Sequence, residues 1–230
     1  MLHAIVFDFD GVLADSEPLH FEVFRQVLAE VGITLTPEAY YARYLGYDDL
    51  GAFAAVLRDH GEPADPEAVR TLMAAKAERF PRLVNGRNVL FPGVADTVRR
   101  FAADVPLAIA SGALPHEIDM ILTGAGLRDA FQVVVGAGET PRSKPAPDPY
   151  VRAIALLQER ALIPPDLNAA SSCVAIEDSK WGILSAKAAG LVCIGVTTSY
   201  DAAELHDADL VVPQVETLSL ARIAALVERE

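Results

Sequence analysis

The chain has 230 residues, 52% of them hydrophobic, and its formal net charge is −13 at pH 7. Domains commonly have about 100–200 residues, so one large domain or a domain with an insert is expected. The negative charge disfavours nucleic acid as a partner, because phosphates demand a basic surface. No apolar run reaches the roughly 20 residues of a membrane span, and the N-terminus has no signal-peptide pattern. We therefore expect a cytoplasmic protein without a membrane partner.

The first apolar run, residues 4–7, ends in two carboxylates, Asp8 and Asp10, and a glycine follows them. Crowding two anions costs free energy unless a cation lies close to both. This pattern at the end of a predicted strand therefore indicates a divalent metal site.

The next part of the chain reads as helical. Residues 17–31 carry apolar side chains at three- and four-residue spacing, as in an amphipathic helix. Helical patterns continue at 39–45, 49–60 and 66–80, separated by glycines such as Gly46 and by prolines, with no strand-like run between them. Residues 16–80 are therefore predicted to form an all-helical cap.

From residue 91 onward, predicted strands alternate with helices. The strand-like runs are residues 107–110, 133–135, 174–176, 192–196 and 210–212. Continuous apolar runs separated by helices indicate a parallel sheet covered on both faces, and residues 4–7 belong to it. The predicted fold is α/β, a doubly wound parallel sheet formed by residues 1–15 and 81–230, with the cap inserted.

Polar groups follow the strands of this predicted sheet. In an open parallel sheet, ligands bind beyond the carboxyl ends of the strands. The groups found there, in chain order, are Asp8 and Asp10, Ser111 and Gly112, Lys144, and Glu177 and Asp178. Carboxylates suit Mg²⁺, whereas a hydroxyl, backbone N–H groups and a lysine suit a phosphate.

The chain resembles the haloacid dehalogenase superfamily of phosphotransferases, in the subgroup of β-phosphoglucomutase and phosphoglycolate-type phosphatases. The resemblance is carried by D-x-D-G-x-L at residues 8–13, Ala-Ser-Gly at 110–112, Ser-Lys-Pro-Ala-Pro-Asp at 143–148 and Glu-Asp-Ser-Lys-Trp-Gly at 177–182. Together with the helical cap, it covers nearly the whole chain.

The resemblance implies roles for the carboxylates. Asp8 would be the nucleophile that forms an aspartyl-phosphate, and Asp10 the general acid and base. Mg²⁺ would be held by Asp8, Asp178 and the backbone carbonyl of Asp10, with Glu177 helping through water. An acidic residue at a helix start also favours the helix dipole, so the sequence leaves Glu177 open between these roles.

The resemblance also implies substrate-binding residues. Ser111, Gly112 and Lys144 would bind the phosphoryl oxygens, and Lys144 would restrain the nucleophile. Lys76 and His20 resemble residues at the edge of the cap that contact the substrate.

The function expected from these features is a Mg²⁺-dependent phosphatase for a small phosphorylated metabolite, such as a sugar phosphate or phosphoglycolate. Alternatives are a β-phosphoglucomutase-type phosphomutase, a carbon–halogen hydrolase and a non-enzymatic phospho-receiver. Tyr47-Asp48-Asp49 stands where the mutase has a phosphate-binding arginine, and Asp10 is foreign to the dehalogenase branch. Receivers lack both a helical cap and D-x-D. The sequence leaves the physiological substrate and the oligomeric state open.

Overall fold

The computed structural model describes residues 1–45, 47–165 and 172–228. The chain divides into two compact units, one of residues 1–15 and 89–230 and one of residues 16–88. Gly46, expected in a cap loop, lies outside the described residues.

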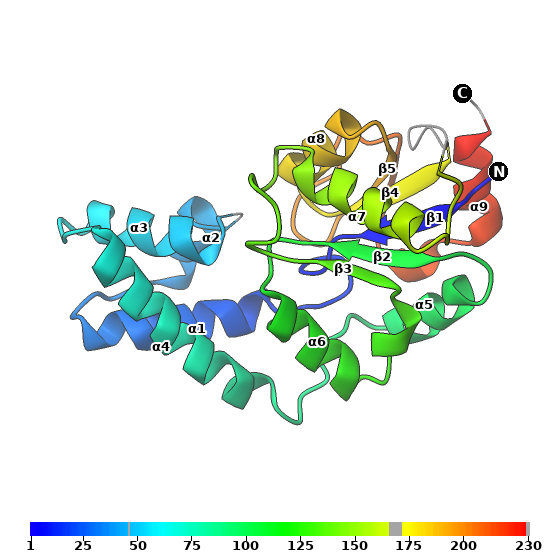
Figure 1. Ribbon diagram of the computed structural model, residues 1–230. Helices are drawn as coiled ribbons and strands as arrows, with labels where there is room; N and C mark the ends of the chain where they lie inside the picture. The colour runs from blue at the N-terminus through cyan, green and yellow to red at the C-terminus, as the bar shows by residue number, and fades with distance from the viewer. Residues whose placement is uncertain (46, 166–171, 229–230) are drawn as a thin grey trace. The chain divides into compact units, whose positions relative to one another are not determined.

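The first unit is built on a six-stranded parallel sheet with the order β3-β2-β1-β4-β5-β6 (Figure 1). The strands are β1 (Ala4–Phe7), β2 (Leu107–Ala110), β3 (Val133–Val135), β4 (Cys173–Glu177), β5 (Val192–Val196) and β6 (Leu210–Val212). The predicted doubly wound parallel sheet is confirmed. Because β1 lies between β2 and β4, the residues that follow these three strands emerge beside one another.

Helices cover the sheet. The core helices are α5 (Val94–Ala102), α6 (Pro115–Gly124), α7 (Asp148–Glu159), α8 (Lys180–Ala188) and α9 (Leu220–Val227), with 3₁₀ turns η1 (Arg128–Ala130) and η3 (Val215–Thr217). α7 packs on β2 and β3, and α8 packs on β4 and β5. No helix of the described residues is long and apolar enough to cross a membrane.

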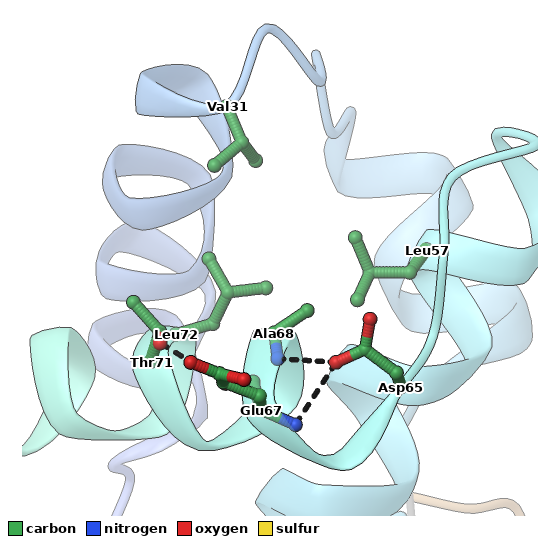
Figure 2. A pocket seen from close by; sticks show the side chains of 7 residues that line it. All are labelled: Val31, Leu57, Asp65, Glu67, Ala68, Thr71 and Leu72. Atoms are coloured by element: carbon green, nitrogen blue, oxygen red, sulfur yellow. Dashed lines mark hydrogen bonds between the residues drawn. The ribbon is translucent and has the colours of Figure 1, made fainter.

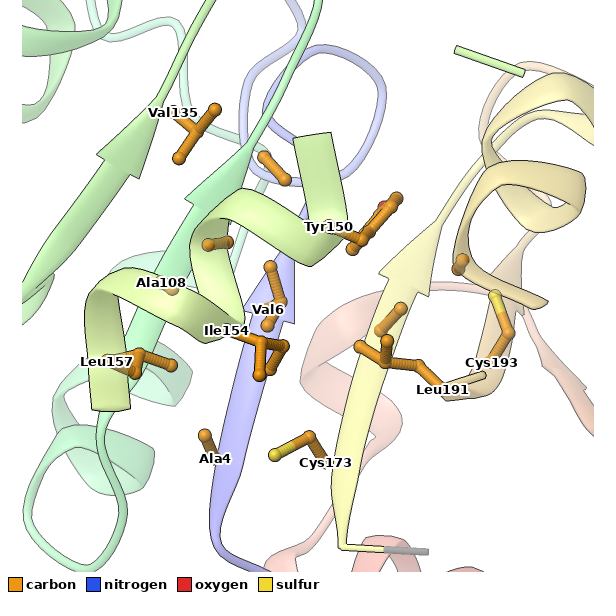
Figure 3. Close-up of a cluster of buried hydrophobic side chains, with 14 of the residues drawn as sticks. Ala4, Val6, Ala108, Val135, Tyr150, Ile154, Leu157, Cys173, Leu191 and Cys193 are labelled. Carbon is orange, nitrogen blue, oxygen red and sulfur yellow. The ribbon is translucent and has the colours of Figure 1, made fainter. Parts of the chain in front are cut away.

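Alternate strand residues supply the core beneath α7 and α8. Ala4 and Val6 of β1 point to the same side because side chains alternate along a strand. Figure 3 shows them with Ile154 and Leu157 of α7 and with Cys173 of β4. Cys173 and Cys193 are both buried free thiols.

The second unit contains α1 (Glu17–Glu30), α2 (Pro37–Arg43), α3 (Asp49–Asp59) and α4 (Pro66–Val84). α4 packs against both α1 and α3. It continues beyond the predicted end at Phe80, through Pro81, and the Asn85 N–H closes its last turn on the Pro81 carbonyl. The unit extends to Asn88, so the predicted boundary after residue 80 falls inside α4.

A small hollow lies at the first turn of α4, lined by Val31, Leu57, Leu72 and polar residues that include Asp65 and Glu67 (Figure 2). Asp65 is the N-cap of α4, and its carboxylate accepts hydrogen bonds from the backbone N–H groups of Glu67 and Ala68. The carboxylate is therefore occupied in starting the helix. None of the predicted site residues lines this hollow.

We predict that Leu157→Ala destabilises the core by about 2–5 kcal/mol, because Leu157 is fully buried and its loss leaves a cavity. Val151→Ala on the same helix is the matched control, since Val151 is half exposed, and should cost less than about 0.5 kcal/mol. Urea denaturation monitored by circular dichroism measures both. Equal losses would show that the α7 face is packed differently.

Candidate active site

The site begins where β1 ends. The backbone N–H of Asp8 donates to the carbonyl of Ile176 at 2.9 Å, which extends the β1–β4 pairing up to the carboxylates. Glu177 is the last residue of β4, and Asp178 follows it. Neighbouring parallel strands thus bring Asp8, Glu177 and Asp178 together, as the strand-end pattern predicted.

Lys144 joins the carboxylates of two strands. Its Nζ lies 2.9 Å from Asp8 Oδ1 and 2.5 Å from Glu177 Oε1. The loop that carries it is tied down on both sides, because Arg142 pairs with Asp148 and the Ser185 hydroxyl donates to the Ala146 carbonyl at 2.6 Å.

Glu177 is fully buried and accepts hydrogen bonds at both carboxylate oxygens. Besides Lys144, the Tyr150 hydroxyl donates to Oε1 at 2.6 Å. The Asp178 N–H and the Ser179 hydroxyl lie 3.3 and 3.4 Å from Oε2. A buried carboxylate is stable only with such partners, so Glu177 is a fixed anion within the fold.

Two glycines allow the backbone to approach these carboxylates. A Cβ on Gly182 would lie about 1.9 Å from the Glu177 carboxylate, and one on Gly11 would lie 1.9 Å from Asp178 Oδ2. Gly11 also has a φ of 76°, which favours glycine. Any side chain at either position would displace a carboxylate of the site.

The three carboxylates fit a divalent cation. One ligand atom from each of Asp8, Glu177 and Asp178 lies within 4.8 Å of the others. Asp8 Oδ1 is buried and accepts no hydrogen bond among the described residues, so its close contact with Lys144 is an ion pair away from the hydrogen-bond direction. A hard cation with oxygen ligands, such as Mg²⁺, suits this donor set. The Asp10 side chain does not belong to this cluster.

The pKa shifts of these groups reflect the free-energy cost of burying several carboxylates close together. Burial raises the pKa of Asp8 to about 7; Glu177 and Asp10 add to the rise, and Lys144 opposes it. Burial, with Asp8 and Glu177, raises the pKa of Asp178 well above its usual range. For Lys144, burial works against the charged form, but Asp8 and Glu177 outweigh it and raise the pKa. Lys144 is therefore a permanent cation.

Ser111 and Gly112 follow β2, the other neighbour of β1. Ser111 is buried; its backbone N–H donates to the Val135 carbonyl at 2.9 Å, and its hydroxyl accepts the Ala113 N–H at 3.2 Å. The backbone N–H of Ser111 is thus used by the sheet. Gly112 is exposed and has open space where a Cβ would stand, so its backbone is accessible to a ligand.

Three site residues were missed by the sequence reasoning. Ser199, after β5, hydrogen-bonds to the Asp178 carboxylate. Its neighbour Thr198 donates to the Gly11 carbonyl. Tyr150 was absorbed into the apolar pattern of α7. The strand-end rule, applied to β5 as it was to β1, β2 and β4, would have found Thr198 and Ser199.

Lys76 and His20 lie in the second unit and share a partner there. His20 stacks on Phe80 with ring centroids 4.4 Å apart, and Lys76 Nζ lies 5.4 Å from the centroid of the same ring. Lys76 is only 1% exposed and pairs with both oxygens of Asp49 at 2.6 and 2.7 Å. Asp48 caps α3 through the Gly51 N–H. The Tyr47-Asp48-Asp49 segment therefore leads directly into α3, and the charge of Asp49 is neutralised by Lys76.

Metal binding should depend on pH in a defined direction. The pKa of Asp8 is raised from 3.8 to about 7, so in metal-free protein this carboxyl's contribution to stability is present below about pH 4 and lost by about pH 7. Asp178 is shifted in the same direction. Mg²⁺ binds the ionised forms, so we predict that it raises the melting temperature at pH 8 and hardly at pH 5.

Scanning calorimetry with and without Mg²⁺ measures this difference. Asp178→Ala should remove most of the Mg²⁺ effect at pH 8, whereas Asp129→Asn, an exposed control at the other edge of the sheet, should keep it. A Mg²⁺ shift of equal size at both pH values would contradict the assignment.

Comparison with known proteins gives consistent matches along the chain. The family model of haloacid dehalogenase-like hydrolases matches residues 2–190. Protein CbbY of Cupriavidus necator is 32% identical over 226 residues, which cover 92% of this chain and 84% of that protein. Fructose-1-phosphate phosphatase YqaB of Escherichia coli is 28% identical over 200 residues, which cover 84% of this chain and 95% of that protein.

Among solved structures, a variant of CbbY from Rhodobacter sphaeroides in complex with xylulose-1,5-bisphosphate superposes with a TM-score of 0.81 at 29% identity, covering 96% of this chain and 98% of that one. The predicted enzyme class, a phosphoric monoester hydrolase, is confirmed by the phosphatases among the relatives. The chain belongs to the haloacid dehalogenase-like hydrolase family.

Proposed function

We propose that the protein is a Mg²⁺-dependent phosphatase that hydrolyses a small phosphorylated metabolite, a sugar phosphate or a phosphoglycolate-like compound, through an aspartyl-phosphate on Asp8. The observation that carries this proposal is the position of Asp8: its Oδ1 lies 2.9 Å from Lys144 Nζ, and Glu177 and Asp178 lie beside it. A nucleophilic carboxylate needs a nearby cation both to hold it and to receive the phosphoryl oxygens.

In the first step an oxygen of Asp8 attacks phosphorus, and the bond from phosphorus to the leaving alcohol oxygen breaks. Asp10 gives its proton to that oxygen. The Lys144 ammonium, the Ser111 hydroxyl and the Gly112 backbone N–H hold the phosphoryl oxygens. Ser111 and Gly112 follow β2, and Lys144 lies in the loop after β3, the strand next to β2 in the sheet.

In the second step Asp10 accepts a proton from water, the water oxygen attacks phosphorus, and the bond to Asp8 breaks. Orthophosphate leaves, and Asp8 is regenerated. Mg²⁺, held by Asp8, Asp178 and the Asp10 carbonyl, with Glu177 acting through water, would offset the repulsion between carboxylate and phosphate.

The substrate class is supported by the relatives. One is named for fructose 1-phosphate, and one related structure contains a sugar bisphosphate. The Lys76–Asp49 pair of the cap carries no net charge, and Asp49 is its more exposed member. It therefore suits hydroxyl groups better than a second phosphate, which favours a phosphatase over a phosphomutase that must rebind its intermediate.

The proposal predicts that wild-type protein with Mg²⁺ releases phosphate from members of a panel of phosphomonoesters and that Asp8→Asn does not. The amide is nearly the size of the carboxylate but is too poor a nucleophile. Phosphate release is measured colorimetrically, with Asp129→Asn as the exposed control. Phosphate release by Asp8→Asn above a few per cent of the wild-type rate would overturn the assignment of Asp8 as the nucleophile.

The same panel separates the alternative activities. Isomerisation of β-glucose 1-phosphate in the presence of a bisphosphate primer, faster than phosphate release, would establish the phosphomutase. Stable phosphorylation of Asp8 without turnover would establish a phospho-receiver, and halide release from haloacids a dehalogenase.

We also predict that Lys76→Met lowers kcat/KM for the preferred sugar phosphate about tenfold but changes that for p-nitrophenyl phosphate less than about twofold. Methionine keeps the length of the side chain and removes its charge. Asp59→Asn, which removes a cap carboxylate paired with Arg43, is the control. Equal losses on both esters would assign Lys76 to the stability of the cap and not to substrate selection.

A further inference from the structure

The hydroxyl of Tyr150 binds the same carboxylate oxygen as Lys144. Tyr150 lies in the first turn of α7 and is fully buried. Its hydroxyl oxygen is 2.6 Å from Glu177 Oε1, and Lys144 Nζ is 2.5 Å from that atom. The reaction proposed above does not use the Tyr150 hydroxyl. This hydroxyl nevertheless shares its acceptor atom, Glu177 Oε1, with Lys144, which the reaction needs.

The ring and the hydroxyl of Tyr150 have separate partners. The ring belongs to the apolar cluster between α7 and the sheet (Figure 3). The Lys144 ammonium also lies 5.2 Å from the ring centroid, within the range of a cation–π contact. Phenylalanine at this position would keep the packing and the cation–π contact and lose only the hydrogen bond to Glu177.

The Tyr150 hydroxyl is the donor in its hydrogen bond to Glu177, because an ionised carboxylate can only accept. Burial, with the negative charge of Glu177, raises the pKa of Tyr150 well above the usual range, so the phenol keeps its proton. Its bond to Glu177 is short, whereas the two contacts at Oε2, from the Asp178 N–H and the Ser179 hydroxyl, are 3.3 and 3.4 Å long. Oε1 therefore receives the two strong donors.

Lys144 is shared between two anions, 2.5 Å from Glu177 and 2.9 Å from Asp8. A hydrogen bond to a charged group is stronger than one to a neutral group. The hydrogen bond from the Tyr150 hydroxyl therefore stabilises part of the buried negative charge of Glu177. Without it, Lys144 would be the one remaining donor to Oε1 of the buried Glu177 among the described residues, and Glu177 would draw the ammonium away from Asp8.

We propose that Tyr150 is a positioning residue that acts through Glu177 to keep the Lys144 ammonium available to Asp8 and to the phosphoryl oxygens. The inference rests on the proposed function, in which Lys144 holds the phosphoryl group.

The test is Tyr150→Phe, with Tyr44→Phe as the matched control. The Tyr44 hydroxyl also donates to a carboxylate, that of Asp59 at 2.7 Å, but in the cap. Tyr150→Phe should lower kcat/KM for p-nitrophenyl phosphate about tenfold and weaken the binding of inorganic phosphate by a similar factor. Its Mg²⁺ affinity, measured by calorimetry, should not weaken, and Tyr44→Phe should match wild type in all three measurements.

A double-mutant cycle with Lys144→Met separates positioning from packing. Phosphate affinity, measured by ³¹P NMR titration, should change less than about twofold when Tyr150→Phe is added to Lys144→Met, because the hydroxyl acts only through the lysine. Additive losses would overturn the inference, as would a Tyr150→Phe variant with a lowered melting temperature but wild-type phosphate affinity. A wild-type protein that hydrolyses no phosphomonoester would overturn the proposed function first, and this inference with it.

Discussion

Three buried or nearly buried carboxylates lie together with one lysine at the carboxyl edge of the sheet, and burying their like charges costs free energy that the surrounding structure must offset. Asp8, Glu177 and Asp178 come from adjacent strands, so the parallel pairing of β1 with β4 makes their proximity unavoidable. Lys144 is the cation that contacts two of them. Burying like charges raises their pKa values, and this is what the shifts of Asp8 and Asp178 express.

The backbone, as well as the side chains, accommodates the buried carboxylates. Gly182 lets the first turn of α8 pack directly on the Glu177 carboxylate, and Gly11 lets the turn after β1 pack on Asp178. The short motifs at residues 8–13 and 177–182 therefore contain a glycine because a carboxylate of the site occupies the space next to that residue's backbone. A side chain at either glycine would occupy the volume that the carboxylate needs.

The sheet and the polar groups at its strand ends could be predicted because both depend on local sequence. Apolar runs set the strands, and each predicted carboxylate lies at the end of its strand or just after it, whereas Lys144 lies farther along, in the loop between β3 and α7. Tyr150 could not be found in this way, since its spacing on α7 matches that of the core residues around it and only its hydroxyl reaches Glu177. The Lys76–Asp49 pair joins residues 27 positions apart on two packed helices, and no local pattern encodes such a contact. The end of α4 was misplaced because Pro81, which usually ends a helix, here lies inside one.

Glu177, which the sequence left open between metal support and a helix start, differs from its neighbours in how its oxygens are used. Both accept hydrogen bonds from the chain, whereas Oδ1 of Asp8 accepts none among the described residues. A cation would therefore replace fewer existing bonds at Asp8 than at Glu177, which supports a role for Glu177 through water and through Lys144. With three carboxylates and one ammonium, the ionised cluster carries a formal charge of −2 (1 − 3). A dication would cancel this charge, so in the proposed reaction the binding of the metal would favour the binding of a phosphate dianion.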